Sequence, residues 1–320
     1  MENLVDRLIA AIEEKENPCC VGLDPIFEKI PAEMKEEVYR SDSGIAVGEE
    51  VGTLFFKFNK SIIDAIKDLV PAVKPQAAFY EAYGLSGLDA LMKTISYAHE
   101  QGLLVIVDAK RNDIGSTAEA YAQGWLRPIR KEKDWSSVFN ADFLTVNPFL
   151  GSDGIKPFLQ ACVEEGKGVF VLAKTSNKSS GELQDLELKD GQRVYEVVAR
   201  QIDLLGREVV GKRGYSAVGA VVGATYPEQA QRLRQLMPHT FFLVPGYGAQ
   251  GATANDIVPC FNNDGYGALI NSSRGIIYAH EQKKYYDSDF STAVRAATIQ
   301  MREEVVQALR QNDKLPASWR

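Results

Sequence analysis

Short apolar runs alternate with amphipathic helical patterns along almost the whole 320-residue chain. The runs are rich in Val, Ile and Leu, which is typical of strands that are buried on both faces. We expect eight such strands, at residues 19–23, 72–74, 103–107, 143–146, 169–172, 217–222, 240–244 and 267–270. Strands that alternate with helices form parallel sheets, and eight repeats are the count of a TIM barrel. The sequence therefore predicts an α/β fold, a single (β/α)8 barrel over residues 1–320.

The helices between these strands are predicted from the spacing of their apolar residues. The clearest covers residues 49–69, where Val51, Leu54, Phe58 and Ile62 fall on one face. The other expected helices are at residues 1–15, 85–101, 154–165, 194–210, 227–237, 251–258 and 290–310, with one more starting at residue 118 and a short one within residues 27–43. Two polar stretches, 125–140 and 177–192, exceed a minimal barrel. We expect them to form loops and short helices on its rim, not a second domain.

Composition excludes several classes of protein. The net charge of −7 argues against nucleic acid as a partner, and no apolar run approaches the ~20 residues of a membrane span. The first 15 residues are amphipathic, unlike a signal peptide. The four cysteines, at positions 19, 20, 162 and 260, have no metal-binding or redox spacing. We therefore expect a reduced, cytoplasmic protein.

One segment places opposite charges at the end of a buried strand. Residues 103–117 read L-L-V-I-V-D-A-K-R-N-D-I-G-S-T, so Asp108, Lys110 and Asp113 follow the apolar run directly, and residues 115–117 suggest a turn and an N-cap. The carboxyl ends of strands carry the chemistry of β/α barrels. A surface network of ion pairs is the alternative, and the buried run that leads straight into these charges argues against it. We expect this cluster to be the catalytic centre.

A glycine-rich segment offers a second site. Residues 246–251 fit G-x-G-x-x-G, the form of a dinucleotide-binding fingerprint. That fingerprint requires an acidic residue at the end of the next strand, but here the strand ends in Asn271-Ser272-Ser273-Arg274. The features that remain are backbone N–H groups at the start of the predicted helix 251–258 and a guanidinium, which together suit a phosphate. Glycines in tight turns and a surface arginine are the alternative.

These motifs together resemble one enzyme family. D-A-K-R-N-D-I-G-S-T resembles the D-x-K-x-x-D signature of the orotidine 5′-phosphate decarboxylases, and Asp24, Lys74, P-G-Y-G-A-Q-G and S-S-R-G match that family in order. V-K-P-Q, T-V-N-P-F-L-G and L-A-K-T-S-N are similar to its larger bacterial branch. The resemblance extends from the first predicted strand to the eighth.

The resemblance implies decarboxylation of orotidine 5′-monophosphate to uridine 5′-monophosphate, the last step of de novo pyrimidine biosynthesis, without metal or organic cofactor. Lys110 would donate the proton to C6, within a charged network formed with Asp108, Asp113 and Lys74. Carboxylates within ~4–6 Å favour the protonated lysine. At an effective dielectric of about 20, each contact near 4 Å contributes about 4 kcal/mol, enough to fix the side chains in one arrangement.

The resemblance also implies which residues bind the ribose, the base and the phosphate of the substrate. Asp113 would reach across a two-fold interface, so the family implies a homodimer with shared sites, in which Thr117 also contributes from the other subunit. Asp24 and Lys74 would bind ribose hydroxyls, and Ser176 the amide edge of the pyrimidine. The phosphate would be held by Gln250 and Arg274, with backbone amides around Gly248 and Ser273.

Two alternatives remain open. A sugar-phosphate decarboxylase, aldolase or epimerase on the same barrel would use Mg²⁺ and a further acid on a neighbouring strand, where this chain has Lys74 instead. A non-catalytic nucleotide-binding barrel is the second alternative, and the complete set of charged residues argues against it. The histidines at 99, 239 and 280 fit no triad or metal spacing and receive no role.

Overall fold

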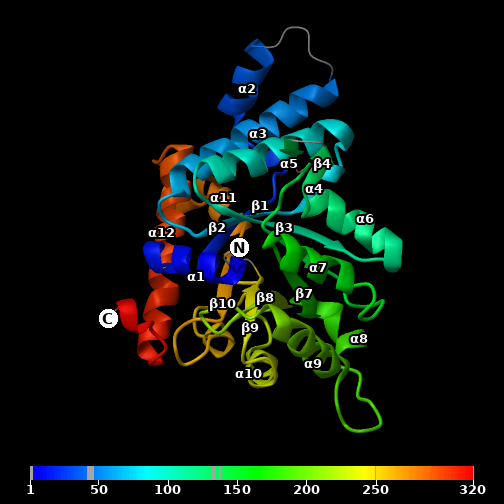
Figure 1. Ribbon diagram of the computed structural model, residues 1–320. Coiled ribbons are helices and arrows are strands. Elements are labelled where there is room, and N and C mark those ends of the chain that lie inside the picture. Colours follow the sequence, from blue (N-terminus) through cyan, green and yellow to red (C-terminus); the bar gives the residue numbers. More distant parts are fainter. Residues whose placement is uncertain (1–2, 42–46, 132–133, 137, 249, 320) are drawn as a thin grey trace.

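The chain forms a closed barrel of eight parallel strands surrounded by helices (Figure 1). This computed structural model describes residues 3–41, 47–131, 134–136, 138–248 and 250–319. Around the barrel the strands are β1 (Cys19–Leu23), β2 (Ala72–Pro75), β3 (Leu104–Arg111), β6 (Phe143–Val146), β7 (Gly168–Lys174), β8 (Ser216–Val222), β9 (Thr240–Val244) and β10 (Ala268–Ser272), which closes on β1. The predicted (β/α)8 barrel is confirmed, because all eight expected strands occur and each pairs with the next one in the chain.

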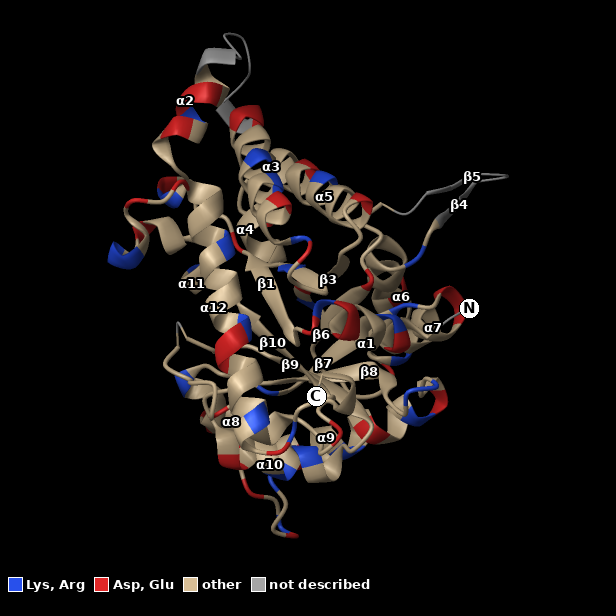
Figure 2. Cartoon of the chain, turned by 90° about the vertical axis from the view of Figure 1, so that its left-hand side faces the viewer, with Lys and Arg blue, Asp and Glu red and all other residues tan. Residues whose placement is uncertain are grey.

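Helices cover the outside of the barrel. They are α1 (Leu4–Lys15), α2 (Ala32–Ser41), α3 (Val47–Ile66), α4 (Ala77–Glu81), α5 (Gly84–Glu100), α6 (Gly115–Trp125), α7 (Lys156–Glu165), α8 (Gly181–Gln184), α9 (Val194–Gly206), α10 (Pro227–Leu236), α11 (Arg274–Ile277) and α12 (Phe290–Gln311). On the side shown in Figure 2, charged residues of both signs are interspersed over these helices. None of the described helices is long and apolar enough to cross a membrane.

The buried side chains form two separate cores. One lies between the strands and the outer helices and contains outward-facing strand residues such as Val73, Val105 and Val107. The other fills the barrel interior, with Phe143, Phe170 and Phe241 among its largest members. The apolar face of α1 belongs to this inner core, so α1 closes the amino-terminal end of the barrel.

Two predicted local structures are wrong. Residues 251–258 do not form a helix, because Gly246, Gly248 and Gly251 have φ values of 102°, 70° and 95°, and only a 3-10 turn, η4 (Val258–Cys260), follows. The second wrong prediction is the turn and N-cap at residues 115–117. Helix α6 begins at Gly115, and its N-cap residue, Ile114, makes no side-chain cap. Residues 115–117 are therefore the first turn of α6 and not a turn and N-cap before it.

The two rim stretches differ from each other. Residues 125–140 contain an antiparallel hairpin, β4 (Ile129–Lys131) and β5 (Asp134–Ser136), where loops and short helices were expected. Residues 132–133 and 137 lie outside the described part of that stretch. Residues 177–192 match the prediction, with a 3-10 turn, η2 (Lys178–Ser180), followed by α8 and a loop.

Glycines in the strands make room for the aromatic rings of the inner core. The rings of Phe143 and Phe170 lie 5.0 Å apart between centroids. A Cβ added at Gly219 would overlap the ring of Phe170 and come within 2.7 Å of the backbone oxygen of Phe241. We expect Gly219→Ala to lower the free energy of unfolding by about 2 kcal/mol, because overpacking forces the rings out of position.

Urea denaturation of the variant measures this effect. The matched control is Gly124→Ala in α6, where an added Cβ meets nothing within 4 Å and the change should stabilise the helix by about 0.5–1 kcal/mol. Equal stability of the two variants would show that the inner core is not tightly packed at Gly219.

Candidate active site

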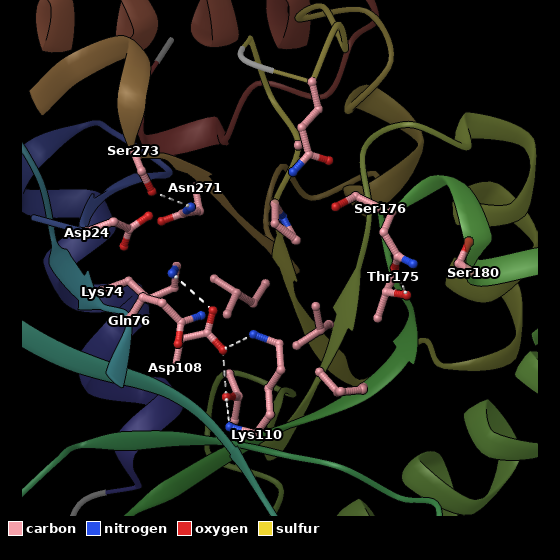
Figure 3. Close-up of a pocket in the computed structure, with 18 of the residues that line it drawn as sticks. Asp24, Lys74, Gln76, Asp108, Lys110, Thr175, Ser176, Ser180, Asn271 and Ser273 are labelled. Atoms are coloured by element: carbon pink, nitrogen blue, oxygen red, sulfur yellow. Dashed lines mark hydrogen bonds and ion pairs between the residues drawn. The ribbon is translucent and has the colours of Figure 1, made fainter. Parts of the chain in front are cut away.

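A cavity of about 600 Å³ opens at the carboxyl ends of the strands (Figure 3). Loops that follow β1, β7, β9 and β10 contribute to its wall, together with the last residues of β2 and β3. Eight of the residues predicted from the sequence line it: Asp24, Lys74, Asp108, Lys110, Ser176, Gln250, Ser273 and Arg274. The structure therefore brings together positions that are 250 residues apart in the chain, from Asp24 to Arg274.

Asp108 is the centre of a hydrogen-bonded set of charges. Its Oδ1 accepts from Lys110 Nζ at 2.6 Å and from Thr145 Oγ1 at 2.8 Å, and its Oδ2 accepts from Lys74 Nζ at 3.2 Å. Figure 3 shows the bonds from Lys74 and Lys110 converging on the Asp108 carboxylate. One anion thus fixes two cations on the cavity wall.

The backbone at Lys110 has an unusual conformation. Its φ is 51°, in the left-handed region that side chains rarely adopt, and the pairing of β3 with β6 shifts register between Val107 and Arg111. The Lys110 N–H donates to Thr145 Oγ1 at 2.9 Å. Because strained backbone persists only where its surroundings hold it, this bulge with its threonine sets the direction of the lysine side chain.

The pKa values of the two buried partners move in opposite directions. Burial alone would raise the pKa of the Asp108 carboxyl, but the ammonium groups of Lys74 and Lys110 hold it well below its usual range. For Lys74, burial works to lower the pKa, but the carboxylates of Asp108 and Asp24 raise it above its usual value. Both groups are therefore charged at neutral pH.

On the same side of the cavity as Lys74, Asp24 has an unsatisfied oxygen. Its Oδ1 is buried and has no hydrogen-bond partner among the described residues, while its backbone oxygen accepts from Tyr278 Oη at 3.0 Å. Asn271 and Ser273 stand beside it at the end of β10 (Figure 3). A buried carboxylate oxygen without a partner is costly, and a ligand hydroxyl in the cavity would satisfy it.

The predicted phosphate and pyrimidine residues follow three different strands, β7, β9 and β10. Thr225 Oγ1 donates to the Ser176 backbone oxygen at 3.2 Å and so holds the β7 loop. Arg274 opens α11, and Gln250 is exposed beside Gly246. Gly248 does not line the cavity, and its N–H donates to the Ala252 backbone oxygen at 2.9 Å.

Asp113 and Thr117 are not among the residues that line this chain's own cavity. The Asp113 carboxylate accepts from the Ile114 N–H at 2.7 Å, and Thr117 is exposed in the first turn of α6. The expected place of Asp113 in the charged network requires a second subunit and therefore stays a prediction; three of the four residues come together within one chain. Asp108, Lys74 and Lys110 form this part of the network together with the Thr145 hydroxyl.

Sequence reasoning missed Thr145 and Asn271. Each is a buried polar residue in a strand whose other members are mostly apolar, F-L-T-V in β6 and A-L-I-N-S in β10. A polar side chain in such a run was the available signal. Only the register across neighbouring strands shows that Thr145 meets Asp108.

The site has no obvious place for a metal ion. In the described ranges, no three or more His, Cys, Asp or Glu side chains come together as metal ligands. The central carboxylate already has two ammonium partners, and their positive charge opposes a further cation.

Enzymes with a (β/α)8 barrel carry their active sites at the carboxyl ends of the strands. The cluster of charged residues at this position therefore assigns the protein to the class of (β/α)8-barrel enzymes. The family model of the orotidine 5′-phosphate decarboxylase / HUMPS family matches residues 19–313. The chain belongs to this family, as its motifs predict.

Named relatives and a solved structure agree with this assignment. The chain is 45% identical to an orotidine 5′-phosphate decarboxylase of Rhodopirellula baltica, over 95% of this chain and 99% of that protein. It is 41% identical to one of Caldicellulosiruptor bescii, over 97% of this chain and 100% of that protein. The structure of Leishmania donovani OMP decarboxylase superposes with a TM-score of 0.71 at 30% identity, covering 96% and 98% of the two chains. The predicted enzyme class, a carboxy-lyase, is confirmed by these relatives.

The charge of Asp108 predicts a pH-dependent stability. Because its pKa is lower in the folded chain than in the unfolded one, its stabilisation is complete above the unfolded pKa of about 3.9 and is lost as the pH falls towards the folded value. We expect Asp108→Asn to be less stable than the wild type by about 3 kcal/mol at about pH 7, because Lys74 loses its buried partner. This difference should be constant down to about pH 5 and shrink below about pH 4.

Urea unfolding of both proteins from neutral to acid pH provides the measurement. Asp89→Asn is the control, since Asp89 pairs with Lys93 on the surface of α5 and the change should alter stability by less than about 0.5 kcal/mol. A gap between wild type and Asp108→Asn that widens towards acid pH would contradict the argument.

Proposed function

We propose that this protein converts orotidine 5′-monophosphate to uridine 5′-monophosphate, the last step of de novo pyrimidine biosynthesis, without a metal or organic cofactor. The observation that carries the proposal is the pair of cations, Lys74 and Lys110, held by Asp108 on the cavity wall. A cavity of about 600 Å³ has the size of a small-molecule site. The names of the relatives support this substrate.

Lys110 is the acid in this proposal. When the bond between C6 and the carboxylate breaks, CO2 leaves and the electron pair stays on C6. The Lys110 ammonium stabilises that charge, and then one of its N–H bonds breaks to form the C6–H bond. A lysine suits both tasks because its ammonium is a compact charge with three donors.

Asp108 has two tasks in the proposed mechanism. It keeps Lys74 charged and holds the ammonium groups of Lys74 and Lys110 in place before the substrate binds, and preorganised charges of this kind give the largest catalytic effect in many enzymes. It also lies beside the substrate carboxylate, so that departure of CO2 removes a repulsion between two anions.

The opposite wall of the cavity suits a pyrimidine ring. Leu172, Val221 and Leu243 line it with apolar surface, on which a flat ring can lie. The Ser176 hydroxyl can donate or accept, which fits the amide edge of the base. Apolar contact and one polar edge together would orient C6 towards Lys110.

In this proposal, the remaining polar groups of the cavity bind the ribose and the phosphate. The unpartnered Oδ1 of Asp24 and the ammonium of Lys74 suit ribose hydroxyls. Gln250 and Arg274, with backbone amides around Gly248 and Ser273, suit the phosphate, although the Gly248 N–H must first leave Ala252. Because the phosphate is remote from C6, its binding energy can hold the site closed around the transition state.

Asp113 and Thr117 enter the proposal through a second copy of the chain. Apolar side chains are exposed next to them: Ile114 is 61% accessible, and Phe149, on the loop after β6, is 73% accessible. That loop contacts β3, since the Asn147 N–H donates to the Arg111 backbone oxygen at 3.1 Å. We propose a homodimer that covers this surface and brings Asp113 and Thr117 to the partner's cavity.

We also propose a cytoplasmic location. Its support is that Cys19, Cys20, Cys162 and Cys260 are all buried free thiols. Burial raises the pKa of the Cys20, Cys162 and Cys260 thiols to about 12, so these groups are unreactive and suit a reducing compartment.

The decisive experiment follows the loss of orotidine 5′-monophosphate absorbance in the presence of EDTA. The wild type should consume the substrate, and Lys110→Ala should lower kcat by roughly 10³-fold or more, because it removes both the charge and the acid. Lys93→Ala, which removes an exposed lysine paired with Asp89 on α5, should retain full activity. Activity that returns only with Mg²⁺ would favour the sugar-phosphate enzymes. Nucleotide binding without turnover by the wild type would favour the non-catalytic barrel.

Mixing two inactive variants tests the shared site. Lys110→Ala and Asp113→Asn should each be inactive alone, since every site would lack one group. After dissociation and random reassociation of an equal mixture, half of the sites in each mixed dimer are complete. We expect roughly a quarter of the wild-type activity to return. No recovery, with mixed dimers demonstrated by mass spectrometry, would mean that each chain builds its own site.

A further inference from the structure

An ion pair between a buried lysine and a partly exposed aspartate on the rim takes no part in the proposed chemistry. Lys174, the last residue of β7, is completely buried, and its Nζ lies 2.8 Å from Asp185 Oδ1. The ammonium also lies over the ring of Tyr226, 4.6 Å from its centroid. Burying an ammonium is unfavourable unless it is paired, so this residue depends on Asp185.

Asp185 belongs to residues 178–192, which we call the rim segment. Gln229 on α10 donates to Asp185 Oδ1 at 3.1 Å. Next to it, Gln184 Oε1 accepts from the Thr175 N–H at 3.0 Å, and Gln184 Nε2 donates to Thr175 Oγ1 at 2.8 Å. The rim segment is therefore fastened to the end of β7 and to α10 at two consecutive residues.

Close to these contacts, the rim segment places one serine in the wall of the cavity. Ser180 is buried and lines the cavity, and its Oγ has no hydrogen-bond partner in the described part of the chain. Ser180 is the N-cap residue of α8, yet its side chain does not cap the helix. In Figure 3 it lies on the same side as Ser176, opposite Asp24 and Lys74. A buried hydroxyl with neither a cap nor a partner needs a hydrogen bond from elsewhere.

We propose that Ser180 Oγ forms a hydrogen bond with the base of the bound nucleotide, and that the Lys174–Asp185 pair is the lock that holds it there. The inference rests on the proposed function, because it assumes a nucleotide in this cavity. Ser180 lies on the side of Ser176, and a hydroxyl satisfies either a carbonyl or an N–H of a pyrimidine. Lys174 and Asp185 touch no substrate and act as positioning residues.

Two ligands that differ only in the base test this inference. Uridine 5′-monophosphate carries the base, the ribose and the phosphate, whereas ribose 5-phosphate lacks the base. We expect Ser180→Ala to weaken binding of uridine 5′-monophosphate roughly tenfold, the effect of one lost hydrogen bond, and to change the Kd of ribose 5-phosphate by less than about twofold. Isothermal titration calorimetry gives both Kd values.

The lock is tested in the same way. Asp185→Asn should weaken uridine 5′-monophosphate at least about tenfold and leave ribose 5-phosphate unchanged, because only the base contact depends on the rim segment. Asp185→Glu, which retains the charge, should recover part of the loss. The matched control is Asp190→Asn, an exposed carboxylate on the same segment whose hydrogen bonds stay within its loop, and it should bind both ligands normally.

The outcomes separate the inference from the function on which it rests. Normal nucleotide affinity in Ser180→Ala would overturn the contact, and equal loss of both ligands in Asp185→Asn would overturn the lock, since a general disturbance affects every part of the cavity. Ser180→Ala leaves the ion pair intact, so it remains informative if Asp185→Asn fails to fold. A wild type that neither binds uridine 5′-monophosphate nor consumes orotidine 5′-monophosphate would instead overturn the proposed function.

Discussion

The ionised carboxylate of Asp108 is the interaction on which the site depends. Without it, Lys74 would lose its main partner in a buried position, and Lys110 would have no anchor across its strained turn. The barrel supplies the conditions for this carboxylate, since β3 carries both Asp108 and Lys110, β2 carries Lys74 and β6 carries Thr145. The charges are held by strands and not by loops, so they are in place before a ligand arrives.

The barrel and its central charges could be predicted from the sequence because both are local signals. Buried strands are continuous apolar runs, and Asp108 and Lys110 follow one such run within three residues, so the sequence already places the two charges close together at a strand end. Thr145 could not be found in this way, since its contact with Asp108 depends on the register between β3 and β6 and on the bulge that shifts it.

Other positions depended on structure that is not local. The expected helix at 251–258 is absent, since Gly251 at its start, like Gly246 and Gly248 before it, has a positive φ that a right-handed helix does not allow. Asp113 was assigned by resemblance to a site shared with a second subunit, and in a single chain its carboxylate accepts from the N–H of Ile114. The Lys174–Asp185 pair joins a strand end to a rim loop, and no periodicity predicts the path of such a loop.

The closure of the barrel by α1 affects how the substrate and the products enter and leave the cavity. In the described part of the chain, aromatic rings fill the interior and α1 covers its amino-terminal end, so the barrel is closed by packed side chains at that end. The described cavity opens at the mouth bounded by the loops after the strands. In the proposed reaction, CO2 would form in this cavity and leave through the same mouth as the nucleotide. Opening of the loops that admit the substrate would then also control the release of CO2. If these loops opened slowly, both products would stay in the cavity together.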